Sequence, residues 1–155
     1  MKVIAVIPAR YKSTRFEGKP LVNLCGKPMI WWVHHQLCQV KGLSEIYVAT
    51  DDERIRKVCS DYGIKYVMTS DSHPTHLDRL AEFAENIESD FYININGDEP
   101  LMMPEYVERL LPTSDLNPVD FYFANAMTKI KKTVEVADIS RIKVVTDNLG
   151  YAMYM

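Results

Sequence analysis

Apolar runs alternate with amphipathic segments along the chain, and this alternation predicts a sheet covered by helices. Short, continuously apolar runs are typical of strands buried on both faces. We predict such strands at residues 2–8, 45–49, 65–68, 91–95, 121–126 and 143–145. Apolar positions at helical spacing predict helices at residues 29–40, 53–62, 76–87 and 104–111. The expected fold class is therefore α/β, with three layers: a mostly parallel, Rossmann-like sheet and helices on both of its faces.

Polar residues beside these segments predict several helix ends. Thr50 or Asp51 suits the N-cap of the helix at 53–62, because short oxygen-bearing side chains accept the free N–H groups of a first turn. Gly63 suits the residue just after that helix, where a left-handed conformation is common. Thr75 and Asp78 have the spacing of a capping box.

The segment after the first apolar run is cationic. Residues 7–21 hold several cations against the single anion Glu17, in a chain whose formal net charge is −3. The cations are Arg10, Lys12, Arg15 and Lys19. Ligands of open α/β sheets bind at the carboxyl ends of strands, where backbone N–H groups and arginines hold phosphate oxygens. The segment predicts a polyphosphate site; a solvated basic loop is the alternative.

Composition narrows the classes of function. The 155 residues, with 47% hydrophobic and 25% charged side chains, suit one soluble globular domain. A pI near 5.8 argues against nucleic-acid binding. No apolar run approaches the roughly 20 residues that span a bilayer, so we expect no membrane segment. Cys25, Cys38 and Cys59 have no metal-type spacing and predict reduced thiols in a cytoplasmic protein.

Residues 7–21 read Ile-Pro-Ala-Arg-Tyr-Lys-Ser-Thr-Arg-Phe-Glu-Gly-Lys-Pro-Leu. This segment resembles the amino-terminal signature of the sugar-acid cytidylyltransferases, most closely the 3-deoxy-manno-octulosonate (KDO) cytidylyltransferase family. Further matching motifs lie at residues 26–30, 48–52, 67–70, 78–82, 97–100 and 144–145. The resemblance implies a fold of the nucleotide-diphospho-sugar transferase type and transfer of CMP from CTP to a KDO-like sugar acid, for lipopolysaccharide or capsule synthesis. It also implies a homodimer.

The resemblance further implies the residues of the site. Arg15, Lys19 and Asp98 are the implied catalytic residues. The implied nucleotide contacts are Ala9, Arg10, Ser13, Arg15, Lys19, Arg79 and Asn96. Asp98 is also the expected ligand of Mg²⁺, because it follows a predicted strand and magnesium is held by one or two carboxylates plus substrate phosphates. A turn-forming aspartate is the alternative interpretation of Asp98.

Two motifs depart from the family pattern. Asn96 stands where the family has glutamine, which keeps an amide on a shorter side chain. His76 and Leu77 replace a Gly-Thr pair, and an imidazole there can fill or reshape the base pocket. Arg79 is retained, and it either approaches the nucleotide or pairs with Asp78 or Glu82 on the helix surface.

Family members continue for about a third of their length beyond the equivalent of residue 155. We therefore expect residues 1–155 to form a single CTP-binding domain, lacking the sugar-acid and dimerisation part and slow or inactive by itself. Three interpretations remain: a fragment of a full enzyme, which we favour, a short homologue that binds nucleotide without turnover, or a non-catalytic α/β interaction module.

Overall fold

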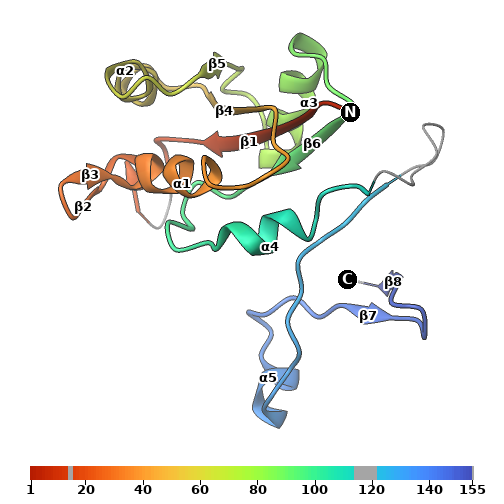
Figure 1. The fold of residues 1–155 in the computed structure, drawn as a ribbon. Coiled ribbons are helices and arrows are strands. Elements are labelled where there is room, and N and C mark those ends of the chain that lie inside the picture. The colour runs from red at the N-terminus through yellow and green to blue at the C-terminus, as the bar shows by residue number, and fades with distance from the viewer. Residues whose placement is uncertain (14–15, 114–121, 155) are drawn as a thin grey trace. The chain divides into compact units, whose positions relative to one another are not determined.

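The computed structural model describes residues 1–13, 16–113 and 122–154 (Figure 1). Contacts within the chain divide it into two compact units, Met1–Thr113 and Ser114–Met155. Each unit is described by itself. The prediction of a single cytidylyltransferase domain over residues 1–155 stays a prediction.

The first unit is built on a four-stranded sheet with the strand order β5-β4-β1-β6. The strands are β1 (Val3–Ala9), β4 (Glu45–Thr50), β5 (Tyr66–Met68) and β6 (Phe91–Asn94). Each neighbouring pair is parallel. These are the strands predicted at 2–8, 45–49, 65–68 and 91–95, so the apolar runs identified the sheet to within one residue at either end of each strand.

Helices cover both faces of this sheet, as predicted. Side chains of β1 alternate between two cores: Ile7 packs with α1 (Met29–Leu37), α2 (Glu53–Asp61) and α4 (Pro104–Glu108), whereas Val6 packs with α3 (His76–Asn86). Figure 1 shows α1 and α3 flanking β1. The three-layer α/β fold class is therefore confirmed.

The predicted helix ends were right in part. The helices predicted at 29–40 and 104–111 end three residues earlier, at Leu37 and Glu108. Thr75 and Asp78 form the capping box before α3, and Gly63 follows the C-cap of α2 with a φ of 67°. The N-cap of α2 was predicted wrongly, because Asp52, and neither Thr50 nor Asp51, accepts the free N–H of Arg54 at 2.9 Å. Thr50 instead accepts the N–H of Asp52 itself.

Three short elements of the first unit were not predicted. They are the 3₁₀ helix η1 (Lys19–Leu21) and the two-residue strands β2 (Asn23–Leu24) and β3 (Lys27–Pro28), which pair antiparallel. Elements of two or three residues are too short to show a hydrophobic period. The cationic segment ends in η1, and β2 and β3 connect it to α1.

The second unit contains α5 (Thr133–Ala137) and the antiparallel pair β7 (Val145–Thr146) and β8 (Ala152–Tyr154). The strand predicted at 121–126 is wrong for residues 122–126, which belong to no strand, and residue 121 lies outside the described residues. A strand needs a partner for its N–H and C=O groups, and an apolar run supplies none. Phe123 is 68% exposed. None of the described helices is long and apolar enough to cross a membrane.

Candidate functional site

The parallel strands β1, β4, β5 and β6 end at one edge of the sheet, so the segments that follow them are neighbours. Ala9 is the buried last residue of β1. Gly97, just after β6, lies against the end of β1, because a Cβ built on it would stand 3.4 Å from the carbonyl oxygen of Pro8. The cationic segment after β1 and the Asp98 segment after β6 therefore meet at this edge.

Lys19 and Asp98 form an ion pair at this edge. The Lys19 Nζ donates to Asp98 Oδ2 at 2.6 Å. The two side chains are 38% and 47% exposed, so both charged groups are accessible from solvent. The predicted phosphate-binding lysine and the predicted metal-binding carboxylate thus occupy one place, although the two residues are far apart in sequence.

The residues next to Asp98 have a hydrogen bond of their own. The Asn96 Nδ2 donates to Glu99 Oε1 at 2.9 Å. Glu99 is therefore engaged with the amide that we predicted as a nucleotide contact. Of the two carboxylates of this turn, Asp98 is the one paired with Lys19.

A backbone hydrogen bond closes a loop within the cationic segment. The Gly18 N–H donates to the Tyr11 carbonyl at 2.8 Å, and Gly18 adopts a φ of 69° that favours glycine. Arg10 is half-buried and Ser13 is exposed, with its Oγ 3.5 Å from the N–H of Phe16. Thr14 and Arg15 lie outside the described residues, so the role predicted for Arg15 stays a prediction.

Arg79 lies inside the protein, where the sequence did not place it. Its side chain is 0% exposed, its Nη2 stands 3.1 Å from Asp51 Oδ2, and its Nη1 donates to Thr69 Oγ1. Pairing with Asp78 or Glu82 on the helix surface was therefore wrong: Asp78 accepts from Thr75 instead.

The partners of Arg79 lie at the ends of two strands. Asp51 directly follows β4 and Thr69 directly follows β5. Among the described residues, the Arg79 Nε and Nη2 have no hydrogen-bond acceptor in suitable geometry, so the contact with Asp51 is an ion pair only. A buried guanidinium with free donors is held at the edge where the candidate site lies. Its contact with a nucleotide stays a prediction.

The departure from the family pattern at His76 and Leu77 lies at the start of α3. His76 is the first residue of the helix, and both His76 and Leu77 are exposed. Glu82, one turn further along, accepts hydrogen bonds from His73 and from the N–H of Ser70. The hydrogen bond from His73, followed by that from the Ser70 N–H, lowers the pKa of the Glu82 carboxyl.

Sequence reasoning missed the first turn of α2. The guanidinium carbon of Arg54 stands 3.2 Å from the ring centroid of Tyr11. Asp52 grips the same guanidinium with both carboxylate oxygens, and these hydrogen bonds, together with that from the Arg54 N–H, lower the pKa of Asp52. The Asp-x-Arg spacing is a signal for the local pair, but nothing in the sequence indicates the contact with Tyr11.

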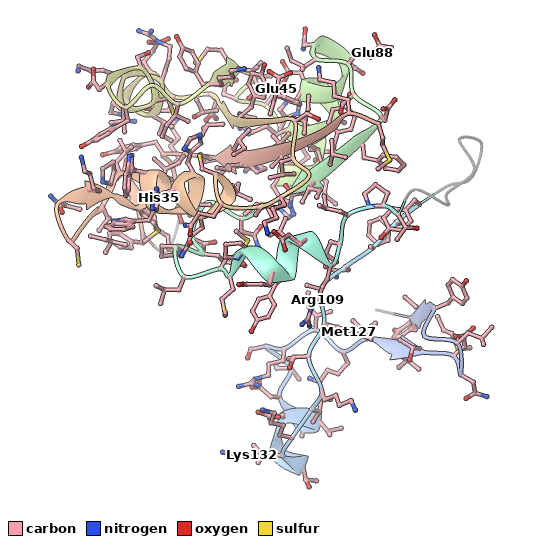
Figure 2. All side chains as sticks on the ribbon, in the orientation of Figure 1. His35, Glu45, Glu88, Arg109, Met127 and Lys132 are labelled. Carbon is pink, nitrogen blue, oxygen red and sulfur yellow. The ribbon has the colours of Figure 1, made fainter. Side chains whose placement is uncertain are left out.

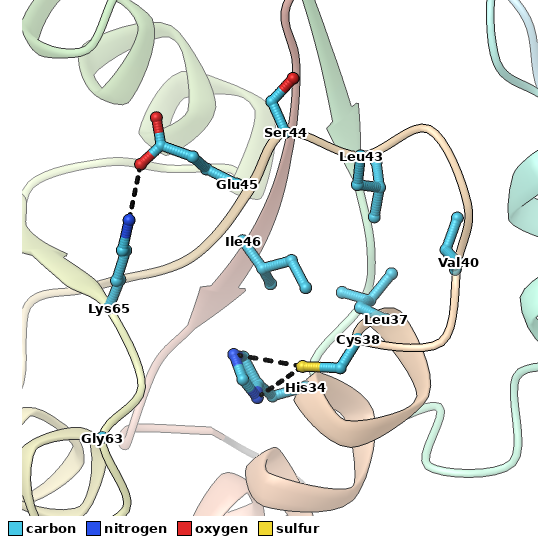
Figure 3. A pocket seen from close by; sticks show the side chains of 10 residues that line it. All are labelled: His34, Leu37, Cys38, Val40, Leu43, Ser44, Glu45, Ile46, Gly63 and Lys65. Carbon is cyan, nitrogen blue, oxygen red and sulfur yellow. Dashed lines mark hydrogen bonds and ion pairs between the residues drawn. The ribbon is translucent and has the colours of Figure 1, made fainter.

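A separate pocket lies away from this edge (Figure 3). It has a volume of about 290 Å³ and is lined by the end of α1, the start of β4 and the residues that precede β5, including His34, Cys38, Glu45 and Lys65. The Cys38 Sγ stands 3.6 Å from the His34 Nδ1. Burial, followed by the charge of His35, lowers the pKa of His34. Because strands β4 and β5 begin here, this pocket is at the opposite edge from Lys19 and Asp98.

Comparisons with known proteins identify the group to which the chain is similar. The sequence model of the cytidylyltransferase family matches residues 4–155. The 3-deoxy-manno-octulosonate cytidylyltransferase of Geotalea uraniireducens is 43% identical over 99% of this chain and 61% of its own length. The 8-amino-3,8-dideoxy-manno-octulosonate cytidylyltransferase of a Shewanella species is 41% identical over 99% of this chain and 64% of its own length. The chain thus spans about three fifths of the length of these curated relatives.

A solved structure is similar over the same extent. A CMP:2-keto-3-deoxy-manno-octonic acid synthetase complexed with CTP matches with a TM-score of 0.87 and 38% identity. The match covers 99% of this chain and 63% of that one. A cytidylyltransferase from Leptospira borgpetersenii, at 22% identity and a TM-score of 0.63, shares the fold.

Proposed function

Because the chain belongs to the cytidylyltransferase family, we propose that it forms the CTP-binding part of an enzyme that transfers CMP from CTP to a KDO-like sugar acid. The observation that carries this proposal is the Lys19–Asp98 pair at the carboxyl edge of the sheet. A phosphate-binding cation and a metal-binding carboxylate side by side are what a nucleoside triphosphate with magnesium requires.

The reaction places simple demands on the protein. A hydroxyl oxygen of the acceptor attacks the α-phosphorus, a new phosphorus–oxygen bond forms, the bond to pyrophosphate breaks, and the hydroxyl proton passes to solvent water. Such a transfer depends on alignment and on neutralising charge that develops on the phosphates. Arg10 and Lys19 supply positive charge, and Ser13 supplies a hydroxyl donor. We propose that Arg15 supplies positive charge as well.

Magnesium fits the donor set at this edge. Asp98 offers carboxylate oxygen, the ligand that Mg²⁺ prefers, on a side chain that is 47% exposed. Among the described residues no group of three or more His, Cys, Asp or Glu side chains is placed to hold a metal. Asp98 would therefore hold the ion together with phosphate oxygens, and the ion would neutralise phosphate charge.

The acceptor class follows from the relatives. One relative is named for 3-deoxy-manno-octulosonate and another for its 8-amino-3,8-dideoxy form. We propose a sugar acid of this group as acceptor, in lipopolysaccharide or capsule synthesis, and a homodimer that works in the cytoplasm. The two acceptors differ at one substituent, so they can be compared directly in an assay.

Calorimetry with CTP, UTP, ATP and GTP, each with Mg²⁺, tests the nucleotide part of the proposal. We expect CTP to bind more tightly than the other three, because a cytidylyltransferase pocket reads the base as well as the phosphates. Equal affinity for all four would indicate a general phosphate loop and contradict the proposal.

An assay of CMP–sugar and pyrophosphate formation, with each of the two octulosonates, tests the transfer. CTP binding without any product from either acceptor, in a chain extended to the length of its relatives, would favour a nucleotide-binding protein without turnover.

A further inference from the structure

Tyr11 joins the cationic segment to the first turn of α2. The guanidinium of Arg54 stacks on the Tyr11 ring, with 3.2 Å between its carbon and the ring centroid. The same ring is packed against Gly18, because a Cβ built on Gly18 would stand 3.0 Å from the Tyr11 Cζ. The ring therefore contacts α2 and the far end of its own loop.

Arg54 is held in place by its own helix. Its Nε donates to Asp52 Oδ1 at 2.9 Å and its Nη2 donates to Asp52 Oδ2 at 2.7 Å. Asp52 is the N-cap of α2 and also accepts the Arg54 N–H at 2.9 Å. A planar guanidinium gripped by two parallel hydrogen bonds has little freedom to rotate. Arg54 thus presents a fixed surface to Tyr11.

Tyr11 and Gly18, which this arrangement holds, are directly adjacent to the candidate phosphate-binding cations. Arg10 directly precedes Tyr11, and Lys19 directly follows Gly18, whose N–H donates to the Tyr11 carbonyl at 2.8 Å. Fixing a loop before a ligand arrives lowers the entropy lost on binding. A loop held at Tyr11 and Gly18 has Arg10 and Lys19 in position before the phosphates bind.

We infer that Arg54, gripped by Asp52 and stacked on Tyr11, is a positioning residue for the phosphate-binding cations of this site. It acts through Tyr11 and touches no reacting atom. This inference rests on the proposed function, because it assigns Arg54 to the binding of the nucleotide's phosphates. An ordinary surface contact that only stabilises the fold is the alternative.

Arg54→Met tests the inference, since it removes the guanidinium and keeps an unbranched side chain. We expect CTP with Mg²⁺ to bind roughly threefold to tenfold more weakly, the effect of losing one cation–aromatic contact. Cytidine, followed by NMR titration, has no phosphates and should bind as it does to the unchanged protein. Tyr11→Leu should act like Arg54→Met, whereas Tyr11→Phe keeps the ring and should act like the unchanged protein. Lys57→Met is the matched control, because Lys57 is an exposed cation of the same helix.

Hydrogen exchange of the Gly18 amide gives a readout that needs no nucleotide. Arg54→Met should speed this exchange severalfold, because the Tyr11–Gly18 contact loosens, and Lys57→Met should not. Equal losses for CTP and cytidine, or an unchanged Gly18 exchange rate, would overturn the inference. If the unchanged protein binds neither CTP nor cytidine, the proposed function fails, and the Gly18 exchange rate alone decides whether Arg54 fixes the loop.

Discussion

At the scale of single residues, the Lys19–Asp98 pair is where the charges of the candidate site meet. Both side chains are substantially exposed. An exposed ion pair contributes little to stability, because water and salt screen the charges. The contact therefore contributes little to folding, and we propose that its position at the carboxyl edge of the sheet serves the binding of a ligand.

Lys19→Met should separate a role of Lys19 in ligand binding from a role in folding stability. We expect CTP binding to weaken by about 1.5–3 kcal/mol, the loss typical of a hydrogen bond to a charged group. The free energy of unfolding should change by less than about 0.5 kcal/mol, as for most exposed substitutions. Calorimetry and urea denaturation measure the two quantities. Lys12→Met, at an exposed lysine of the same segment, should alter neither; an equal loss of affinity there would mean that the loop attracts phosphates by net charge alone.

The sequence predicted which residues lie together at the carboxyl edge of the sheet where one strand leads directly to one side chain. Lys19 and Asp98 follow β1 and β6, and parallel strands place such residues at one edge. It failed where a side chain reaches across the fold. Arg79 of α3 contacts Asp51 and Thr69, which follow β4 and β5, and the contact of Arg54 with Tyr11 joins α2 to the segment after β1. No local spacing records contacts of this kind.

At the scale of elements, Glu45 connects the amino ends of the strands. Its carboxylate lies 2.8 Å from the Lys65 Nζ, accepts from the Tyr47 hydroxyl at 2.7 Å, and lies 3.2 Å from the Lys2 Nζ. Lys65 precedes β5 and Lys2 precedes β1, so one side chain at the start of β4 joins three strands. Figure 3 shows Glu45 facing Lys65, and Figure 2 marks Glu45 in the whole unit.

These partners should make stability depend on pH. The hydrogen bond from Lys65, followed by those from Tyr47 and Lys2, lowers the pKa of Glu45 from 4.5 to about 2. A lowered carboxyl pKa stabilises the folded state above the unfolded value of 4.5, and this contribution is lost as the pH falls through about 2.

Glu45→Gln should therefore be less stable than the unchanged protein at neutral pH, and the difference should shrink across that acid range. Urea denaturation of both proteins at several pH values measures it. Glu88→Gln is the control for an exposed carboxyl near the same edge. A difference between Glu45→Gln and the unchanged protein that does not vary with pH would show that Glu45 contributes by packing and not by its charge.

The elements themselves were predictable to different degrees. Buried parallel strands read as continuous apolar runs, and β1, β4, β5 and β6 were found for that reason. Capping residues located the start of α3 because the Thr75–Asp78 hydrogen bonds are local. The strand predicted at 121–126 was wrong for residues 122–126, because an apolar run identifies no pairing partner. The hairpin of β2 and β3 was too short to produce a pattern.

At the scale of the whole molecule, the two units differ in how much they bury. In Met1–Thr113, β1 is buried from Val3 to Ile7, and its side chains pack into two cores. In the second unit, none of the described residues 122–154 is buried. Many of its apolar side chains are largely exposed, among them Ile139, Ile142, Leu149 and Met153. Apolar burial is the main favourable contribution to folding, so the two units should differ in stability.

Hydrogen exchange along the 155-residue chain should show this difference. Amides of β1 should exchange only through global unfolding, with protection factors above about 10³, because a domain of ordinary stability rarely opens completely. Amides of α5, β7 and β8 should have protection factors below about 10², because few buried contacts oppose their local opening. Mass spectrometry of peptides from one labelled sample measures both sets, so β1 serves as the internal control.

The result also decides the prediction of a single domain over residues 1–155. Units that open independently have separate exchange rates and respond separately to denaturant. Low concentrations of urea should therefore speed exchange in residues 122–154 while leaving β1 unchanged. CTP with Mg²⁺, which we propose to bind at Lys19 and Asp98, should slow exchange around those residues in the first unit. Protection that is equal in β1 and β8, and lost at the same urea concentration, would contradict the expected difference and would mean that the chain unfolds as one cooperative domain.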